Sequence, residues 1–147
     1  MISTLYKATS LLLLLPTLAF GAIGEVTDYS GSGAVERDEG FEVYEVTDGL
    51  GVESMDVVVT EKGKVRIDFI DDTRVDITEH SRLIIDDFVY DPASGEGSLS
   101  LKAGLGTIRY ASGKIAKNSR QRVRIETPSA VVGVRGTDFA MIVDEIG

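Results

Sequence analysis

The sequence contains no cysteine, no tryptophan and a single histidine, His80. Without cysteine the chain forms no disulfide, carries no thiolate nucleophile and builds no cysteine-based zinc site. His80 lies in a turn-like segment, where we expect it to face solvent, so the sequence gives no support to a Ser-His-Asp triad. Aromatic residues amount to only 7%, which argues against an aromatic-lined groove for a sugar or a nucleobase.

Positive charge is also scarce, because 15 Lys and Arg stand against 24 Asp and Glu and give a net charge of −9. Such a surface repels nucleic acid and anionic lipid, so we predict no nucleic-acid partner. The exception is the segment 102–124, which holds seven basic residues and no acidic one. It either pairs with the acidic segment 25–91 within the fold or forms a patch for an anionic partner.

A long apolar run occurs only at the N-terminus, in residues 8–20. Lys7 precedes this run, Pro16 interrupts it, and the small residues Ala19 and Gly21 follow, which is the pattern of a secretory signal cleaved before Ala22. The alternative is an uncleaved anchor, but the run is short for a membrane span. We therefore predict a signal peptide over 1–21 and an exported protein, periplasmic or extracellular, with no transmembrane span in the mature chain.

The mature chain alternates apolar and polar residues with a period of two. Residues 64–70, KVRIDFI, place Val65, Ile67 and Phe69 on one face and charged residues on the other. Such alternation predicts strands over 33–37, 41–46, 55–60, 64–70, 74–78, 82–90, 98–102, 106–111, 122–126, 130–135 and 138–143, separated by turns that include Lys62-Gly63 and Gly104. The fold class is therefore all-β: a single domain over 23–147 of about ten short strands, β-solenoid-like or a sandwich.

Acidic pairs are the remaining candidates for catalysis. Asp71 and Asp72 are adjacent, as are Asp86 and Asp87. Adjacent residues on a strand point to opposite faces, so a sequential pair is not expected to act as a catalytic pair. Oxygen donors gather in 86–96, but their spacing does not match a calcium-binding loop. We predict no catalytic residue, no metal and no cofactor.

The most distinctive stretch is 127–143, TPSAVVGVRGTDFAMIV. Pro128 is placed where a strand begins, a position that tolerates the missing N–H. Arg135 lies near Gly133 and next to Gly136 in an apolar neighbourhood. We expect a carboxylate or carbonyl groups to fix its guanidinium at a tight corner, with Thr137 starting the next strand. The alternative is that Arg135 binds an anion.

This stretch resembles the signature of the FecR-like family, in which Thr-Pro opens a strand and a Val-Arg-Gly-Thr turn precedes a final apolar strand. The matching residues are Thr127, Pro128, Val134, Arg135, Gly136 and Thr137, and the resemblance implies a structural role for them. Segments 55–85 and 99–108 are similar to the family's upstream strands, so the resemblance covers roughly 31–143. Two features depart from the family: Asp71-Asp72-Thr73 replaces its usual Asp-Gly-Ser/Thr turn, and the leader runs directly into strands, where family regulators carry a sigma-factor-binding segment and a membrane span.

The resemblance implies a non-enzymatic exported domain that binds an envelope protein or ligand, through a sheet edge or face, with a role in cell-surface signalling. The identity of that partner is left open. A structural or adhesive envelope protein that associates with itself is the first alternative. A carboxylate-dependent glycoside hydrolase, which needs two suitably spaced acids in a cleft, is the second.

Overall fold

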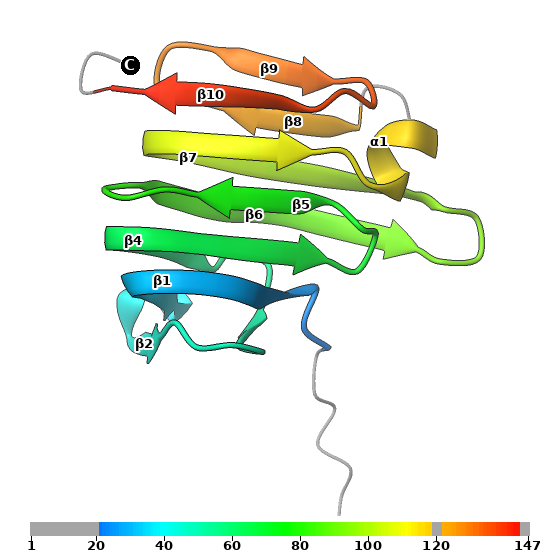
Figure 1. Ribbon diagram of the computed structural model, residues 1–147. Coiled ribbons are helices and arrows are strands. Elements are labelled where there is room, and N and C mark those ends of the chain that lie inside the picture. The colour runs from blue at the N-terminus through cyan, green and yellow to red at the C-terminus, as the bar shows by residue number, and fades with distance from the viewer. Residues whose placement is uncertain (1–20, 119–121, 145–147) are drawn as a thin grey trace, which may run out of the picture.

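The computed structural model describes residues 21–118 and 122–144, and strands dominate its secondary structure (Figure 1). Most of the predicted leader therefore lies outside the described residues. The elements, in chain order, are β1 (Gly24–Arg37), the 3-10 helix η1 (Asp38–Gly40), β2 (Glu42–Glu45), β3 (Gly51–Val52), β4 (Val57–Phe69), β5 (Arg74–Ile77), β6 (Arg82–Asp91), β7 (Glu96–Ala111), α1 (Lys114–Asn118), β8 (Val123–Glu126), β9 (Val131–Val134) and β10 (Phe139–Val143). The prediction of a single all-β domain is confirmed.

The ten strands of the described chain form one sheet that folds over into two layers (Figure 1). The first layer contains β3, the first half of β1, the second half of β4, β5, the second half of β7, and β10. The second layer runs in the order β2, second half of β1, first half of β4, β6, first half of β7, β8, β9. All neighbours pair antiparallel except β7 and β8. The layers face each other as in the sandwich alternative.

Long strands pass from one layer to the other at a common corner. Gly31 of β1 lies opposite Gly63 of β4, and both have positive φ values, 72° and 147°. A Cβ on Gly63 would lie 1.8 Å from the carbonyl oxygen of Ser30, and a Cβ on Gly31 equally close to that of Lys62. The predicted turns at Lys62-Gly63 and Gly104 are wrong, because the strand continues through each glycine and bends there instead of reversing.

The core lies between the two layers and is built by the alternation seen in the sequence. Val65, Ile67 and Phe69 are buried as predicted, and Phe69 stacks on Phe88 of the opposite layer with ring centroids 5.4 Å apart. Burial of each such side chain contributes about 1.5–3 kcal/mol. The other large buried side chains come from both layers: Val26, Val35, Val58, Val75, Ile77, Leu83, Ile85, Leu99, Leu101, Ile108, Tyr110, Val123, Ile125 and Val134.

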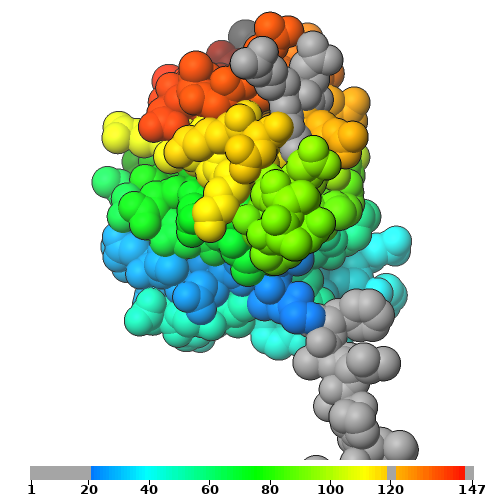
Figure 2. Space-filling view, turned by 90° about the vertical axis from the view of Figure 1, so that its right-hand side faces the viewer, coloured from blue at the N-terminus to red at the C-terminus, as the bar shows by residue number. Residues whose placement is uncertain are grey.

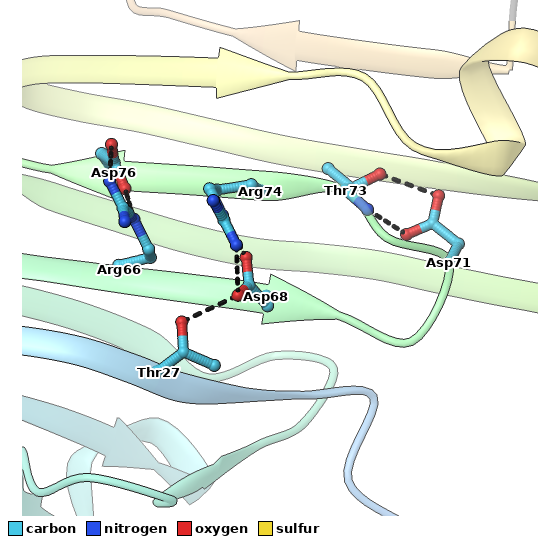
Figure 3. Close-up of polar contacts among 7 residues, drawn as sticks. All are labelled: Thr27, Arg66, Asp68, Asp71, Thr73, Arg74 and Asp76. Atoms are coloured by element: carbon cyan, nitrogen blue, oxygen red, sulfur yellow. Dashed lines mark hydrogen bonds and ion pairs between the residues drawn. The ribbon is translucent and has the colours of Figure 1, made fainter.

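Opposite the corner, the helix α1 and the hairpin between β6 and β7 cover the open side of the two layers (Figures 1 and 2). The fully buried carboxylate of Asp71 holds α1 in place, because it accepts a hydrogen bond from the Ile115 amide at 3.2 Å. It also accepts bonds from the amide and hydroxyl of Thr73, which close the turn (Figure 3). Asp72 has a φ of 67°, so it adopts the left-handed conformation that the family's glycine would take. The replacement of that glycine thus leaves the turn intact.

The first half of β1, η1, β3 and α1 were not predicted. The first half of β1 was missed because six consecutive residues, 27–32, are exposed and show no alternation. The two-residue β3 and the five-residue α1 are too short to show a period. Their positions depend on partners far away in the sequence, β1 for β3 and Asp71 for α1.

Candidate functional site

The signature residues build two successive turns at the C-terminal end of the sheet. Thr127 closes the first, between β8 and β9: its hydroxyl accepts a hydrogen bond from the Ala130 amide at 3.0 Å, and its own amide donates to the Ala130 carbonyl at 2.8 Å. Pro128 lies inside this turn, three residues before β9, and does not open the strand itself. A proline in a turn leaves no ladder bond unmade, which suits the structural role expected of these two residues.

The second turn joins β9 to β10, which belong to different layers. Val134 ends β9 with its side chain buried, and Gly136 has a φ of 78°. Ser112, at the end of β7, ties the turn down: its hydroxyl donates to the Thr137 carbonyl at 2.7 Å, and its amide donates to the Asp138 carboxylate at 2.8 Å. These contacts agree with the structural role that the resemblance implies for Val134, Gly136 and Thr137.

Arg135 behaves differently from its neighbours. Its side chain is exposed, and among residues 21–118 and 122–144 it makes no hydrogen bond or ion pair. The expected carboxylate or carbonyl partner is therefore not found in the described part of the chain. An exposed guanidinium on a well-anchored turn is free to meet the carboxylate of another molecule.

The turn with Arg135 joins two strands that each have an open edge. Within the described residues, β9 pairs only with β8, and β10 pairs only with β7. Each carries an exposed aliphatic side chain, Val131 at 63% and Ile142 at 79%. Open strand edges present unpaired N–H and C=O groups and accept added strands from partners. These edges, with Arg135 between them, are the candidate contact surface.

The outer face of the first layer carries a ladder of alternating charges (Figure 3). Asp28 of β1, Arg66 of β4, Asp76 of β5 and Arg109 of β7 follow one another across the strands. Arg66 holds Asp76 through two hydrogen bonds of 2.6 and 3.0 Å, and this contact raises the pKa of Arg66. The four residues line a shallow hollow of about 290 Å³.

A second pair of opposite charges, Arg74 and Asp68, lies beside the pair formed by Arg66 and Asp76. Arg74 donates two hydrogen bonds to Asp68 at 2.6 and 3.0 Å, and Thr27 donates a third at 2.9 Å (Figure 3). The bonds from Arg74 lower the pKa of the Asp68 carboxyl. Exposed pairs of this kind contribute little to stability, but they favour one register between neighbouring strands.

The two adjacent acid pairs take part in contacts within the fold. Asp71 is buried and accepts three hydrogen bonds, whereas Asp72 is exposed and pairs with Lys114 at 3.1 Å. A general acid needs a carboxyl whose pKa is raised. In the hollow, the Asp76 carboxylate accepts two hydrogen bonds from Arg66.

The pair Asp86 and Asp87 departs from the rule that neighbours on a strand alternate. A β-bulge between Ile85 and Asp87 turns both carboxylates to the outer face, where Asp86 contacts Ser100 and Lys102 and Asp87 contacts Ser98. The expectation of opposite faces is wrong here. The hydrogen bond from Lys102 lowers the pKa of Asp86, the opposite of what acid catalysis requires.

The carboxylates in 86–96 that could serve as calcium ligands, those of Asp86, Asp87 and Asp91, accept hydrogen bonds within the fold. Asp91 accepts hydrogen bonds from the Ala93 amide and the Ser94 hydroxyl, which shape the turn between β6 and β7. Over the described residues, no group of three or more His, Asp or Glu is placed to hold a metal ion. His80 lies in the turn before β6 with an exposed side chain, as expected.

The basic segment 102–124 was expected either to pair with the acidic segment 25–91 or to form a patch for an anionic partner, and its residues differ in this respect. Lys102 pairs with Asp86 and Lys114 with Asp72, both acids of the segment 25–91, and Arg124 pairs with Glu126. Arg122 is exposed and has no ion pair in the described part of the chain. Pairing within the fold accounts for part of this charge. Of the other described basic residues, Arg109 lines the hollow of the first layer, Lys117 lies in α1 and Arg122 precedes β8.

The fold and its contact surface define a single-domain all-β protein whose candidate site is a pair of sheet edges. A family model described as FecR protein matches residues 55–146, which is more than half of the chain, and the chain belongs to this family. The match begins at Met55, so β1, η1, β2 and β3 precede it. Membership makes this a signalling-related domain in a family of signalling regulators.

Comparisons with curated proteins and with solved structures gave no match. No helix in the described residues is long and apolar enough to span a membrane.

Proposed function

We propose that this protein is an exported, non-enzymatic contact domain that binds an envelope protein or ligand in cell-surface signalling. The observation that carries the proposal is the open edge of β10 in a chain of the FecR family. The leader-like segment 1–21 supports export to the periplasm or the extracellular space. The fixed turn that presents Arg135 supports recognition of an acidic group beside the added strand.

The test of export is the N-terminus of the protein recovered from cells that make the full chain. We expect a mature protein that begins at Ala22 in the periplasmic or extracellular fraction. An intact chain that begins at Met1 and remains in the cytoplasm would contradict this part of the proposal.

The test of binding is a photo-crosslinking side chain placed at position 142, on the open edge of β10. The matched control is the same side chain at position 89, because Val89 is also exposed, at 57%, but lies on β6 away from both edges. We expect one defined product with an envelope component from position 142, absent from position 89 and reduced by Arg135→Gln. The same products from both positions would refute an edge-specific contact.

A second candidate function is self-association within the envelope. It is favoured by the opposite net charges at the two ends of the second layer.

A further inference from the structure

The second layer ends in two open strands of equal length. Its order runs from β2 at one side to β9 at the other, and each of these strands has four residues. In the described residues β2 pairs only with β1, and β9 pairs only with β8. The layer therefore presents an edge of the same size at each of its two ends, shown at the bottom and the top of Figure 1.

The directions of these strands suit contact between copies. The second half of β1 is antiparallel to β2 and to β4, β4 to β6, and β6 to β7. The strand β8 is parallel to β7, and β9 is antiparallel to β8. It follows that β9 runs opposite to β2. When a second copy is stacked in the same orientation, its β2 meets β9 of the first copy as an antiparallel neighbour, the more stable pairing.

The two edges carry opposite charge. Residues 36–48, which contain β2, hold six acidic residues and one basic residue, a net charge of −5. Residues 122–135, which contain β8 and β9, hold three basic residues and one acidic residue, a net charge of +2. In Figure 2 the cyan residues around β2 and the orange residues of β8 and β9 lie toward opposite ends of the molecule. Copies stacked head to tail bring the two charges together, whereas head-to-head contact places like charges side by side.

Apolar side chains occupy the same two edges. Phe41 is 85% exposed and Val43 is 63% exposed at the β2 edge, and Val131 is exposed at the β9 edge. Val43 pairs with Glu36 and Val131 pairs with Glu126, so both valines point to the outer face of the layer. Gly133 lies on the same face of β9, and no atom lies within 4 Å of the point that a Cβ would occupy there, which leaves room for a large neighbour. Pairing of the edges would bury these groups against one another.

The β2 edge is held rigidly, which lowers the entropic cost of binding. Arg37 donates two hydrogen bonds, of 2.8 and 2.7 Å, to the fully buried carboxylate of Asp56, and these bonds raise the pKa of Arg37. Its guanidinium also lies 5.0 Å from the ring centroid of Tyr44 in β2. This network fixes β2 against the end of β1, although β2 itself contributes only exposed side chains.

From these observations we infer that the protein associates with itself head to tail, with β2 of one copy adding to β9 of the next. The second layers of successive copies then form one continuous sheet. Because the two surfaces differ, the contact repeats and produces open chains or rings, not a closed two-fold dimer. The contact goes beyond the proposed function, since it uses the second layer and leaves the β10 edge of the first layer to a partner.

The test is the weight-average mass of the purified protein, measured by sedimentation and light scattering. We expect the mass to rise between about 10 µM and 1 mM, as suits a short edge contact. We also expect association to weaken about tenfold when salt is raised from about 0.05 to 0.5 M.

Two single variants and their mixture decide which edges meet. Val43→Lys places a cation opposite the basic β9 edge, and Val131→Glu places an anion opposite the acidic β2 edge. Each variant alone should associate at least about tenfold more weakly than the wild type. An equimolar mixture should recover association, because the unchanged edges pair with each other and the new Lys and Glu attract. Val89→Lys is the matched control and should behave as the wild type.

Recovery in the mixture also demonstrates that both variants are folded. The inference is overturned if the wild type remains monomeric up to about 1 mM, the concentration at which even millimolar affinity is visible. It is equally overturned if only one variant loses association, which would indicate a two-fold contact of one edge with itself, or if the mixture does not recover. Failure of the crosslinking at position 142 would leave these results unaffected, so the two proposals fail separately.

Discussion

Substitution of Gly63 by alanine tests whether the sheet folds over at the glycine corner. At φ 147° a residue with a side chain costs about 1–3 kcal/mol. The new Cβ would lie 1.8 Å from the Ser30 carbonyl oxygen, whereas a tolerated C···O contact is about 3.3 Å. The two strands would have to separate by about 1.5 Å, weakening roughly two flanking hydrogen bonds at about 1 kcal/mol each. The expected loss in the free energy of unfolding is about 4 kcal/mol.

The assay is equilibrium unfolding in urea followed by circular dichroism. With a slope near 2 kcal/mol per molar urea, the midpoint of Gly63→Ala should fall by about 2 M. Gly133→Ala is the matched control, because no atom lies within 4 Å of its added Cβ, and its free energy of unfolding should change by less than about 1 kcal/mol. If the two variants unfold within about 0.5 kcal/mol of each other, the corner is not held by close backbone contact and the reasoning fails.

Three further predictions concern buried or paired polar groups. Asp71→Ala should lower the free energy of unfolding by about 2–4 kcal/mol and speed amide exchange in α1. The control is Asp72→Asn, because asparagine also suits the left-handed conformation at this exposed position, and it should change the free energy by less than about 0.5 kcal/mol. Equal losses would contradict the role of Asp71. Lys102→Met should raise the pKa of Asp86 toward its ordinary value in an NMR titration, and an unchanged pKa would refute the pairing. Because the folded-state pKa of Asp86 is lowered, the stability that this carboxylate contributes is present above about pH 4. That stability is lost as the pH falls through the folded-state pKa. Burial raises the pKa of Tyr110 to about 12, so the stability that its neutral hydroxyl contributes is present below about pH 10 and is lost as the pH rises toward 12. This hydroxyl has no hydrogen bond of standard geometry in the described chain. Tyr110→Phe should therefore unfold less readily than the wild type at about pH 11, and the reverse result would count against this assignment.

The sequence predicted the local features of the fold because they depend on neighbours in the chain. The alternation around Ile67 determines which face is buried, and the turn at Asp71–Thr73 follows from short-range chemistry. The corner at Gly63 could not be distinguished from a turn, because glycine suits both. The difference is decided by Gly31, which lies opposite it on another strand.

The candidate site was predicted only in part, for the same reason. Thr127 closes a turn and Val134 is buried, and their structural role stays a prediction, whereas Arg135 lacks the partner expected for it in the described residues. Sequence reasoning also missed the Arg37–Asp56 pair, since the two residues lie 19 positions apart and neither belongs to a motif. Arg37 is a charged residue followed by turn signals, and the sequence around it does not indicate that its partner Asp56 is fully buried.

By itself, then, the sequence determined the all-β class, the core-facing residues and membership of the FecR family, since these follow from period-two alternation and a local motif. Only the tertiary structure decided which strands end the two layers and which charges gather there. Glu45 and Arg122 are 77 positions apart, and nothing in the chain order sets their sides of the molecule. Their placement toward opposite ends of the second layer follows from the order in which the strands pair, and that order depends on long-range contacts.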